Sequence, residues 1–152
     1  MNAVKLLKAD HELVEGLFKE VEGSDATEHP VLFVDIKAEL EAHAHVEESI
    51  FYPAIQEDGD DKLVELTSEA LKEHAQMKVF LGELTAVTSD LDKFEPLLVK
   101  LIADVRHHVE EEEGEMFPLV EDQFDKATLE TWGEQMQAEK DRFQSSSESA
   151  YA

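Results

Sequence analysis

The sequence contains one pattern twice, and this repeat constrains the fold more than any other feature. The first copy is His43-Ala-His-Val-Glu47-Glu48-Ser-Ile-Phe-Tyr52-Pro53, and the second is His108-Val-Glu-Glu-Glu112-Glu113-Gly-Glu-Met-Phe117-Pro118. Both read H-x-x-x-E-E-x-x-x-[aromatic]-P, and the second begins 65 residues after the first. A dipeptide precedes each copy, Asp10-His11 in the first half and Glu73-His74 in the second. Each half of the chain therefore supplies one isolated histidine and one His-x-x-x-Glu.

The His-x-x-x-Glu spacing has a direct meaning on an α-helix. Residues i and i+4 lie about 40° apart around the helix axis and about 6 Å apart along it, so their side chains converge. Such a pair can hold one metal ion, or two adjacent ions with the carboxylate between them. Four helices would then bring four imidazoles and two carboxylates to one interior point, as in the dinuclear carboxylate sites of helix bundles.

The apolar pattern indicates that these groups point inward. Apolar residues recur at alternating spacings of three and four along four segments, which is typical of the buried stripe of an amphipathic helix. Positions in these stripes where a leucine would be expected hold His11, His43, Glu47, His74, His108 and Glu112. A carboxylate buried among apolar side chains costs several kcal/mol unless it is paired or bound to metal. Neither stripe that contains a glutamate contains a lysine or arginine, so we interpret the six residues as metal ligands.

The same stripes predict an all-α fold, an up-down four-helix bundle with a short fifth C-terminal helix. The first helix is expected from Asn2 to Gly23, the second from about Pro30 to Pro53, the third from about Lys62 to Val87, and the fourth past Pro118 to about Phe124. The fifth is expected from about Thr128 to Phe143. Residues 1–144 are predicted to form one domain, and the serine-rich residues 145–152 a disordered tail.

Composition excludes several classes of function. The formal net charge is −24, which argues against nucleic acid or an anionic membrane as a partner, because both select basic surfaces. The chain has no cysteine, so disulfides, iron–sulfur ligation and a thiol nucleophile are excluded. No stretch resembles a signal peptide or reaches transmembrane length, so a cytoplasmic location is the expectation.

The repeated motif, with the Asp-His and Glu-His dipeptides, resembles the hemerythrin-like family, the cation-binding domain named for its His-His-Glu motifs. The likeness covers about Lys8 to Val120, and the fifth helix is similar to the extra helix of many bacterial members. The resemblance implies a site of two non-heme iron ions joined by an oxo or hydroxo bridge. It also implies terminal ligands at His11, His43, His74 and His108, and bridging carboxylates at Glu47 and Glu112.

The sequence departs from the oxygen-carrying hemerythrins at Lys78. Those proteins have a second histidine one turn after the third-helix histidine, and its loss here argues against simple reversible oxygen carriage. Lys78 is expected to reach solvent, with a contact to a bound oxidant as the alternative. His29 is left open as a further ligand, and His45 and His107 are interpreted as solvated or outer groups. Glu48 and Glu113 are interpreted as a polar helix face, with hydrogen bonds to the ligand imidazoles as the alternative.

Imidazole and carboxylate suit iron, manganese or zinc, and the resemblance favours two irons. The leading hypothesis is a diiron protein that binds or reacts with O2, H2O2 or NO inside the bundle. The alternative is an iron or oxygen sensor, or an iron-handling module, without catalytic turnover. A peroxide- or NO-consuming activity would make the protein an enzyme, and no catalytic residue is assigned. A protein partner or a homodimer is left open.

Overall fold

The computed structural model describes the backbone of residues 1–151 and the side chains of residues 1–146. These residues form helices and no strand, which confirms the all-α prediction. The order is α1 Ala3–Glu22, a short 3-10 turn at Ala26–Glu28, α2 His29–Val46, a π-helical turn η2 at Glu47–Phe51, α3 Tyr52–Asp58, α4 Asp61–Ala86, α5 Leu91–Glu111, a second π-helical turn η3 at Glu112–Met116, α6 Phe117–Gln123 and α7 Lys126–Tyr151.

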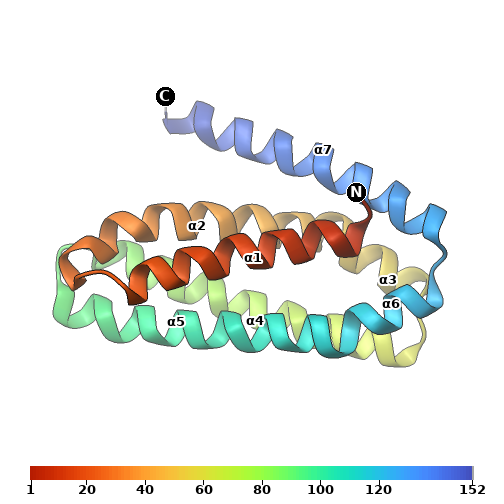
Figure 1. The fold of residues 1–152 in the computed structure, drawn as a ribbon, viewed down its shortest axis with the longest axis horizontal. Helices are drawn as coiled ribbons and strands as arrows, with labels where there is room; N and C mark the ends of the chain where they lie inside the picture. Colours follow the sequence, from red (N-terminus) through yellow and green to blue (C-terminus); the bar gives the residue numbers. More distant parts are fainter. Residues whose placement is uncertain (152) are drawn as a thin grey trace.

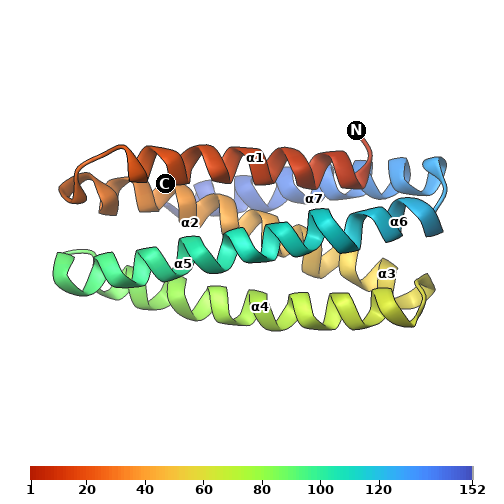
Figure 2. The same ribbon diagram turned by 60° about the horizontal axis from the view of Figure 1, so that its bottom comes forward.

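The helices form a bundle of two antiparallel pairs, in which α1 packs on α2 and α4 packs on α5 (Figures 1 and 2). The first helix begins and ends where the sequence predicts, because Asn2 Oδ1 accepts a hydrogen bond from the Lys5 N–H (2.9 Å) and Gly23 caps the C-terminal end. Among the described residues, no helix is long and apolar enough to cross a membrane.

Both copies of the motif contain a π-helical turn, which begins at the buried glutamate of the copy, Glu47 or Glu112. The N–H of Tyr52 bonds to the carbonyl of Glu47, and the N–H of Phe117 bonds to the carbonyl of Glu112, five residues back in each case. The following Pro53 and Pro118 have no N–H and would clash with the carbonyl four residues back in a regular α-helix. The wider turn lets each helix continue past its proline, into α3 and α6. π-Helical turns of this kind occur mostly at functional sites.

Two apolar clusters form the core, and the polar residues of the motifs lie between them. One cluster contains Leu7, Tyr52, Leu63 and Phe117, and the other contains Val14, Leu40, Met77 and Val105. On every long helix of the bundle the histidine therefore separates apolar residues of one cluster from those of the other. Because each cluster buries its own set of large side chains, the bundle encloses a polar layer without depending on that layer for its hydrophobic contacts.

The fifth helix, α7, lies along α1 and α2 on the side away from α4 and α5 (Figure 1). Its apolar residues Leu129, Trp132 and Met136 pack on the first cluster. The helix continues through Tyr151, past the predicted end near Phe143, and it equals α4 in length at 26 residues. The predicted tail at residues 145–152 thus includes helical backbone as far as Tyr151, and Ala152 lies outside the described residues. The division at residue 144 stays a prediction.

His29, at the start of α2, makes a structural contact between three helices. Its Nδ1 donates to Glu95 Oε1 (2.7 Å) and its Nε2 donates to the carbonyl of Val21 (2.8 Å). Both partners are acceptors, so the ring must carry two protons to satisfy them. Burial lowers the pKa of His29, but the bonds to Glu95 and Val21 outweigh this effect and raise the pKa above its ordinary value of 6.5.

Replacing His29 with glutamine is expected to destabilise the protein at acid pH and to have little effect at alkaline pH. The raised pKa means that protonation favours the folded state, so the stabilisation is fully present below pH 6.5 and is lost as the pH rises through the higher folded pKa. We expect a loss of about 1–2 kcal/mol at pH 5.5, the size of a hydrogen bond to a charged group. Urea unfolding of the variant and the parent at pH 5.5 and 9 measures it, and an equal loss at both pH values would contradict this explanation.

Candidate metal centre

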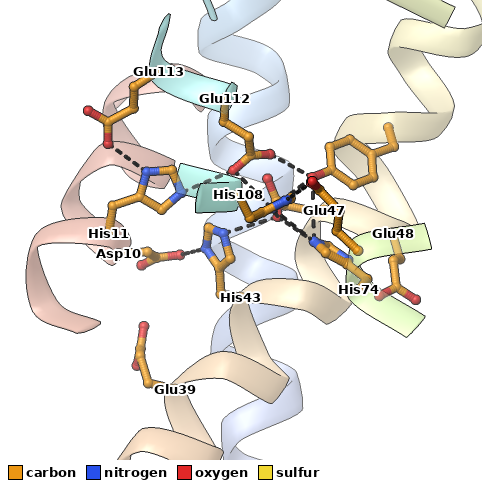
Figure 3. A network of polar contacts seen from close by, with 12 residues as sticks. Asp10, His11, Glu39, His43, Glu47, Glu48, His74, His108, Glu112 and Glu113 are labelled. Atoms are coloured by element: carbon orange, nitrogen blue, oxygen red, sulfur yellow. Dashed lines mark hydrogen bonds and ion pairs between the residues drawn. The ribbon is translucent and has the colours of Figure 1, made fainter. Parts of the chain in front are cut away.

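The six residues that the sequence singles out converge in the polar layer between the two core clusters (Figure 3). All six side chains are buried, and Glu47 and Glu112 are the most enclosed, with 0% and 1% of their surface exposed. Ligand atoms of His11, His43 and Glu112 lie within 4.8 Å of one another, and so do those of Glu47, His74 and His108. The structure thus brings the six together as two adjacent groups, each with two imidazoles and one carboxylate.

Each carboxylate belongs to one group and also lies beside an imidazole of the other. Glu112 Oε1 is 3.1 Å from His11 Nε2 in its own group and 3.4 Å from His108 Nε2 in the other. Glu47 Oε1 is 3.1 Å from His74 Nε2 and 3.0 Å from His43 Nε2. These contacts place an oxygen from η2 and an oxygen from η3 beside imidazoles of both groups. Such an arrangement suits two cations that share two carboxylates.

Two buried polar atoms at the centre have no hydrogen-bond partner among the described residues, and they are His43 Nε2 and Glu47 Oε2. His43 Nε2 lies 3.0 Å from Glu47 Oε1 without the alignment of a hydrogen bond. Unsatisfied buried atoms of this kind are rare in folded proteins and call for an explanation such as a bound ion. Imidazole nitrogen and carboxylate oxygen are donors that first-row transition metals accept. The residues present therefore fit a metal centre.

Every one of the four imidazoles is held from outside by a second carboxylate on its Nδ1. His11 donates to Glu113 (2.6 Å), His43 to Asp10 (2.8 Å), His74 to Glu48 (2.8 Å) and His108 to Glu73 (2.7 Å). Because a carboxylate only accepts, a proton sits on Nδ1, and Nε2 is the nitrogen that remains for a metal ion at the centre. This arrangement fixes both the ring orientation and the tautomer that a metal ligand requires.

These outer carboxylates explain the dipeptides that accompany the motif. Asp10 and Glu73 each orient the motif histidine of their own half, and Glu48 and Glu113 each orient the isolated histidine of the other half. Both Glu48 and Glu113 bond to imidazoles, which confirms the alternative interpretation of these residues. Glu113 also lies on an exposed helix face, with 39% of its side chain exposed. Asp10 and Glu73 were noticed only as neighbours of histidines. The sequence contains an indication of this role. Each residue directly precedes a histidine of the buried stripe, so its side chain is turned by about 100° from the stripe, toward the neighbouring helix.

The aromatic residue of the motif differs between the two copies, and this makes the centre asymmetric. The hydroxyl of Tyr52 is fully buried and donates to Glu112 Oε2 (2.6 Å), and it lies 3.4 Å from His74 Nε2. Phe117, at the matching position, has no hydroxyl. Its ring stacks on the His11 ring, with the two ring centroids 5.8 Å apart and an angle of 8° between the ring planes. Sequence reasoning treated both only as aromatic positions, so it missed the tyrosine hydroxyl at the centre.

The carboxylates at the centre change the pKa values of the groups around them. Burial lowers the pKa of His43, but Glu47, Asp10 and Glu112 outweigh this and raise it to about 10. Burial raises the pKa of Tyr52, and the nearby carboxylates of Glu112 and Glu47 raise it further, so its hydroxyl stays a neutral donor. The His43 imidazole therefore attracts a proton in the metal-free protein, and a metal ion that binds to it must displace that proton.

The remaining histidines and Lys78 lie outside the two groups. His29 is held by Glu95 and Val21 as described above. His45 bonds to Glu139 of α7 (2.8 Å), and the exposed His107 contacts Glu111 (2.7 Å) on its own helix. Lys78 is half exposed and donates to Glu48 (2.7 Å), the carboxylate that orients His74. Lys78 therefore reaches solvent, as expected, and it also contacts the centre indirectly, through Glu48.

A cavity of about 190 Å³, partly open to solvent, adjoins the centre and gives small molecules a place beside it. Apolar side chains of four helices line it, namely Val14, Leu40, Met77, Val105 and Val109. The histidines His11, His43, His74 and His108 line it toward the centre, and Gln76 and Asp104 are further polar lining residues. Glu73 and the exposed His107 also line it, and together with Glu111 they form a third, more open cluster. The size and lining favour a small uncharged molecule over a charged or bulky one.

Comparisons with known proteins agree with this geometry. Residues 2–120 match the sequence model of the hemerythrin HHE cation-binding domain. A solved structure of a hemerythrin HHE cation-binding domain-containing protein from Mycobacterium kansasii is similar, with a TM-score of 0.81 and 27% identity over 96% of this chain and 89% of that chain. A DNA nickase from Nostoc sp. (strain PCC 7120 / SAG 25.82 / UTEX 2576) is 28% identical over 148 residues, which are 95% of this chain and 40% of the nickase. The chain spans less than half of that relative. The chain belongs to the hemerythrin HHE cation-binding domain family.

Proposed function

We propose that this protein holds two iron ions and uses them to react with a small oxidant such as H2O2, O2 or NO. The observation that carries the proposal is the placement of Glu47 and Glu112, each beside imidazoles of both groups. One ion would be held by His11 and His43 and the other by His74 and His108, with both carboxylates between them. Four imidazoles and two carboxylates leave coordination positions free on two ions. When bound, such ions supply redox electrons and a place for a small oxidant.

The residues around the ions would control which molecules arrive and how they are oriented. The apolar part of the cavity excludes most water and admits small neutral molecules beside His74 and His108. The Tyr52 hydroxyl points at Glu112 Oε2 at 2.6 Å and can keep that carboxylate in place. Tyr52 keeps its proton but has only one, so it would donate to a molecule that develops negative charge beside His74 by turning away from Glu112 Oε2. Phe117 offers no such donor, so we propose that reaction occurs on the Tyr52 side.

Iron is preferred over a structural zinc ion because closed zinc sites use four ligands around one ion, and this centre offers six ligands in two groups. A DNA-directed activity like that named for the Nostoc relative is not proposed. With a formal charge of −24, this chain would be repelled by nucleic acid phosphates. The alternative, a sensor without turnover, makes use of the same centre and differs in whether the oxidant is consumed.

The proposal is tested by metal content and spectra of freshly purified protein. We expect two irons per chain and a near-ultraviolet absorption that changes when H2O2 is added, with consumption of the peroxide. A Tyr52→Phe variant should keep both irons and consume peroxide more slowly, by about 10–100-fold if the hydroxyl acts as a donor to the reacting molecule. A reversible spectral change without consumption would favour the sensor. One zinc, or a stable protein with no metal, would contradict the proposal.

A further inference from the structure

A buried lysine on α7 is connected to the metal centre through one carboxylate. Lys140 Nζ donates to Asp10 Oδ1 (2.6 Å) and to Glu39 Oε1 (3.0 Å). The other oxygen of Asp10 accepts from His43 Nδ1 (2.8 Å). We propose that Lys140 positions His43 through Asp10, so that docking of α7 and metal binding at the His11, His43 and Glu112 group support each other. This inference rests on the proposed metal-binding function.

Burial makes this contact significant. The side chains of Lys140, Asp10 and Glu39 are 12%, 6% and 9% exposed, so the two carboxylates have little water to solvate them. A buried carboxylate that loses its counter-charge turns toward whatever water or donor it can reach. Asp10 would then no longer hold the His43 ring at a fixed angle. Figure 3 shows Asp10 beside His43 and Glu39 on the same side of the centre.

The second half of the centre has a more exposed counterpart, because Lys78 donates to Glu48, which orients His74. Lys78 is 54% exposed and lies on α4 rather than on α7. Glu73 corresponds to Asp10 in the repeat and orients His108 in the same way. Glu73 lines the cavity, and its side chain is 21% exposed. It forms ion pairs with His107 and His108. Among the described residues, α7 bonds to the carboxylate that orients His43 and to none of the other three that orient an imidazole. The coupling is therefore expected to act on one metal ion and to leave the other nearly unchanged.

The contacts of α7 show which part of it can respond. Its first half is held tightly, since Trp132 and Met136 pack in the core and a side chain at Gly133 would clash with the backbone at Met1. Its second half is held by polar contacts of Lys140 with Asp10 and Glu39 and of Glu139 with His45, and by the ring of Phe143, which stacks on His45. A segment with few buried apolar contacts opens at low free-energy cost. Coupling is reciprocal, so a metal ion that fixes His43 must also favour the docked second half.

The test is a titration of full-length protein with Co²⁺ under anaerobic conditions, followed by its absorption. Lys140→Met keeps the aliphatic stem and removes the charge. We expect one of the two ions to bind about 10–100-fold more weakly, the usual effect of losing a group that orients a ligand, and the other to be unchanged. Lys140→Arg, which keeps the charge, should restore most of the lost affinity. Arg142→Met is the matched control, because Arg142 lies on the same helix, is 67% exposed and contacts Glu139 instead of Asp10.

A second measurement follows α7 itself by amide hydrogen exchange of residues 137–146, with and without Co²⁺. In the parent protein, Co²⁺ should slow exchange there, and in Lys140→Met it should not. If the parent binds two ions and exchange in α7 does not change, the coupling is refuted while the proposed function stands. Equal losses of affinity in Lys140→Met and Arg142→Met would also refute it. A parent protein that binds no Co²⁺ would refute the proposed function itself.

Discussion

Replacing Glu47 or Glu112 with alanine is expected to remove most of the bound metal and to leave the helical content unchanged. Each carboxylate lies within 3.4 Å of imidazoles from both groups, so its loss would remove a ligand from both ions at once. A histidine replacement such as His74→Ala should affect mainly one ion. The helices should remain because the apolar clusters on either side of the polar layer keep all their contacts.

Glu110→Ala is the matched control, since Glu110 lies on α5 two residues before Glu112 and its side chain is exposed. Metal analysis by mass spectrometry and far-ultraviolet circular dichroism of the three variants and the parent would measure both quantities. We expect well under one iron per chain in Glu47→Ala and Glu112→Ala, and the parent value in Glu110→Ala. Two irons retained in Glu47→Ala or in Glu112→Ala would show that the replaced carboxylate does not bridge the ions.

Replacing Phe51 with alanine is expected to cost about 3–5 kcal/mol of the free energy of unfolding. The Phe51 side chain is fully buried in the first π-helical turn. Its ring meets Phe117 of the second motif at 6.0 Å and Trp132 of α7 at 6.3 Å, both edge to face. The cavity left by alanine would therefore loosen the contact between both motifs and the fifth helix. Small proteins have only about 5–15 kcal/mol of stability, so this single change could remove most of it.

Guanidinium unfolding of metal-free protein measures this loss. Phe51→Leu should cost much less, because it keeps most of the apolar volume, and Val99→Ala is the control at an exposed position of α5. A loss below 1 kcal/mol in Phe51→Ala would mean that the turn repacks and that the ring does not hold the two motifs together.

The sequence by itself determined the helices and the six central residues. A period of three and four residues locates a buried stripe without any knowledge of its partner, and a histidine or glutamate in that stripe must face the core. This is why His11, Glu47 and Glu112 were predicted as buried and were found buried. The ends of α1 were predicted for a similarly local reason, the cap at Asn2 and the glycine at Gly23. The metal-binding role of the six central residues stays a prediction, to be tested as described above.

The tertiary structure decided everything that depends on the faces between helices. A residue next to the stripe can face solvent or a neighbouring helix, and the chain alone does not say which. Glu48 and Glu113 therefore read as a polar surface, whereas they bind imidazoles of other helices. The tyrosine hydroxyl at the centre depends on a π-helical turn, a change of helical register that periodicity does not reveal. The contact of Lys140 with Asp10 joins residues 130 positions apart, and only the packing of α7 across α1 and α2 creates it.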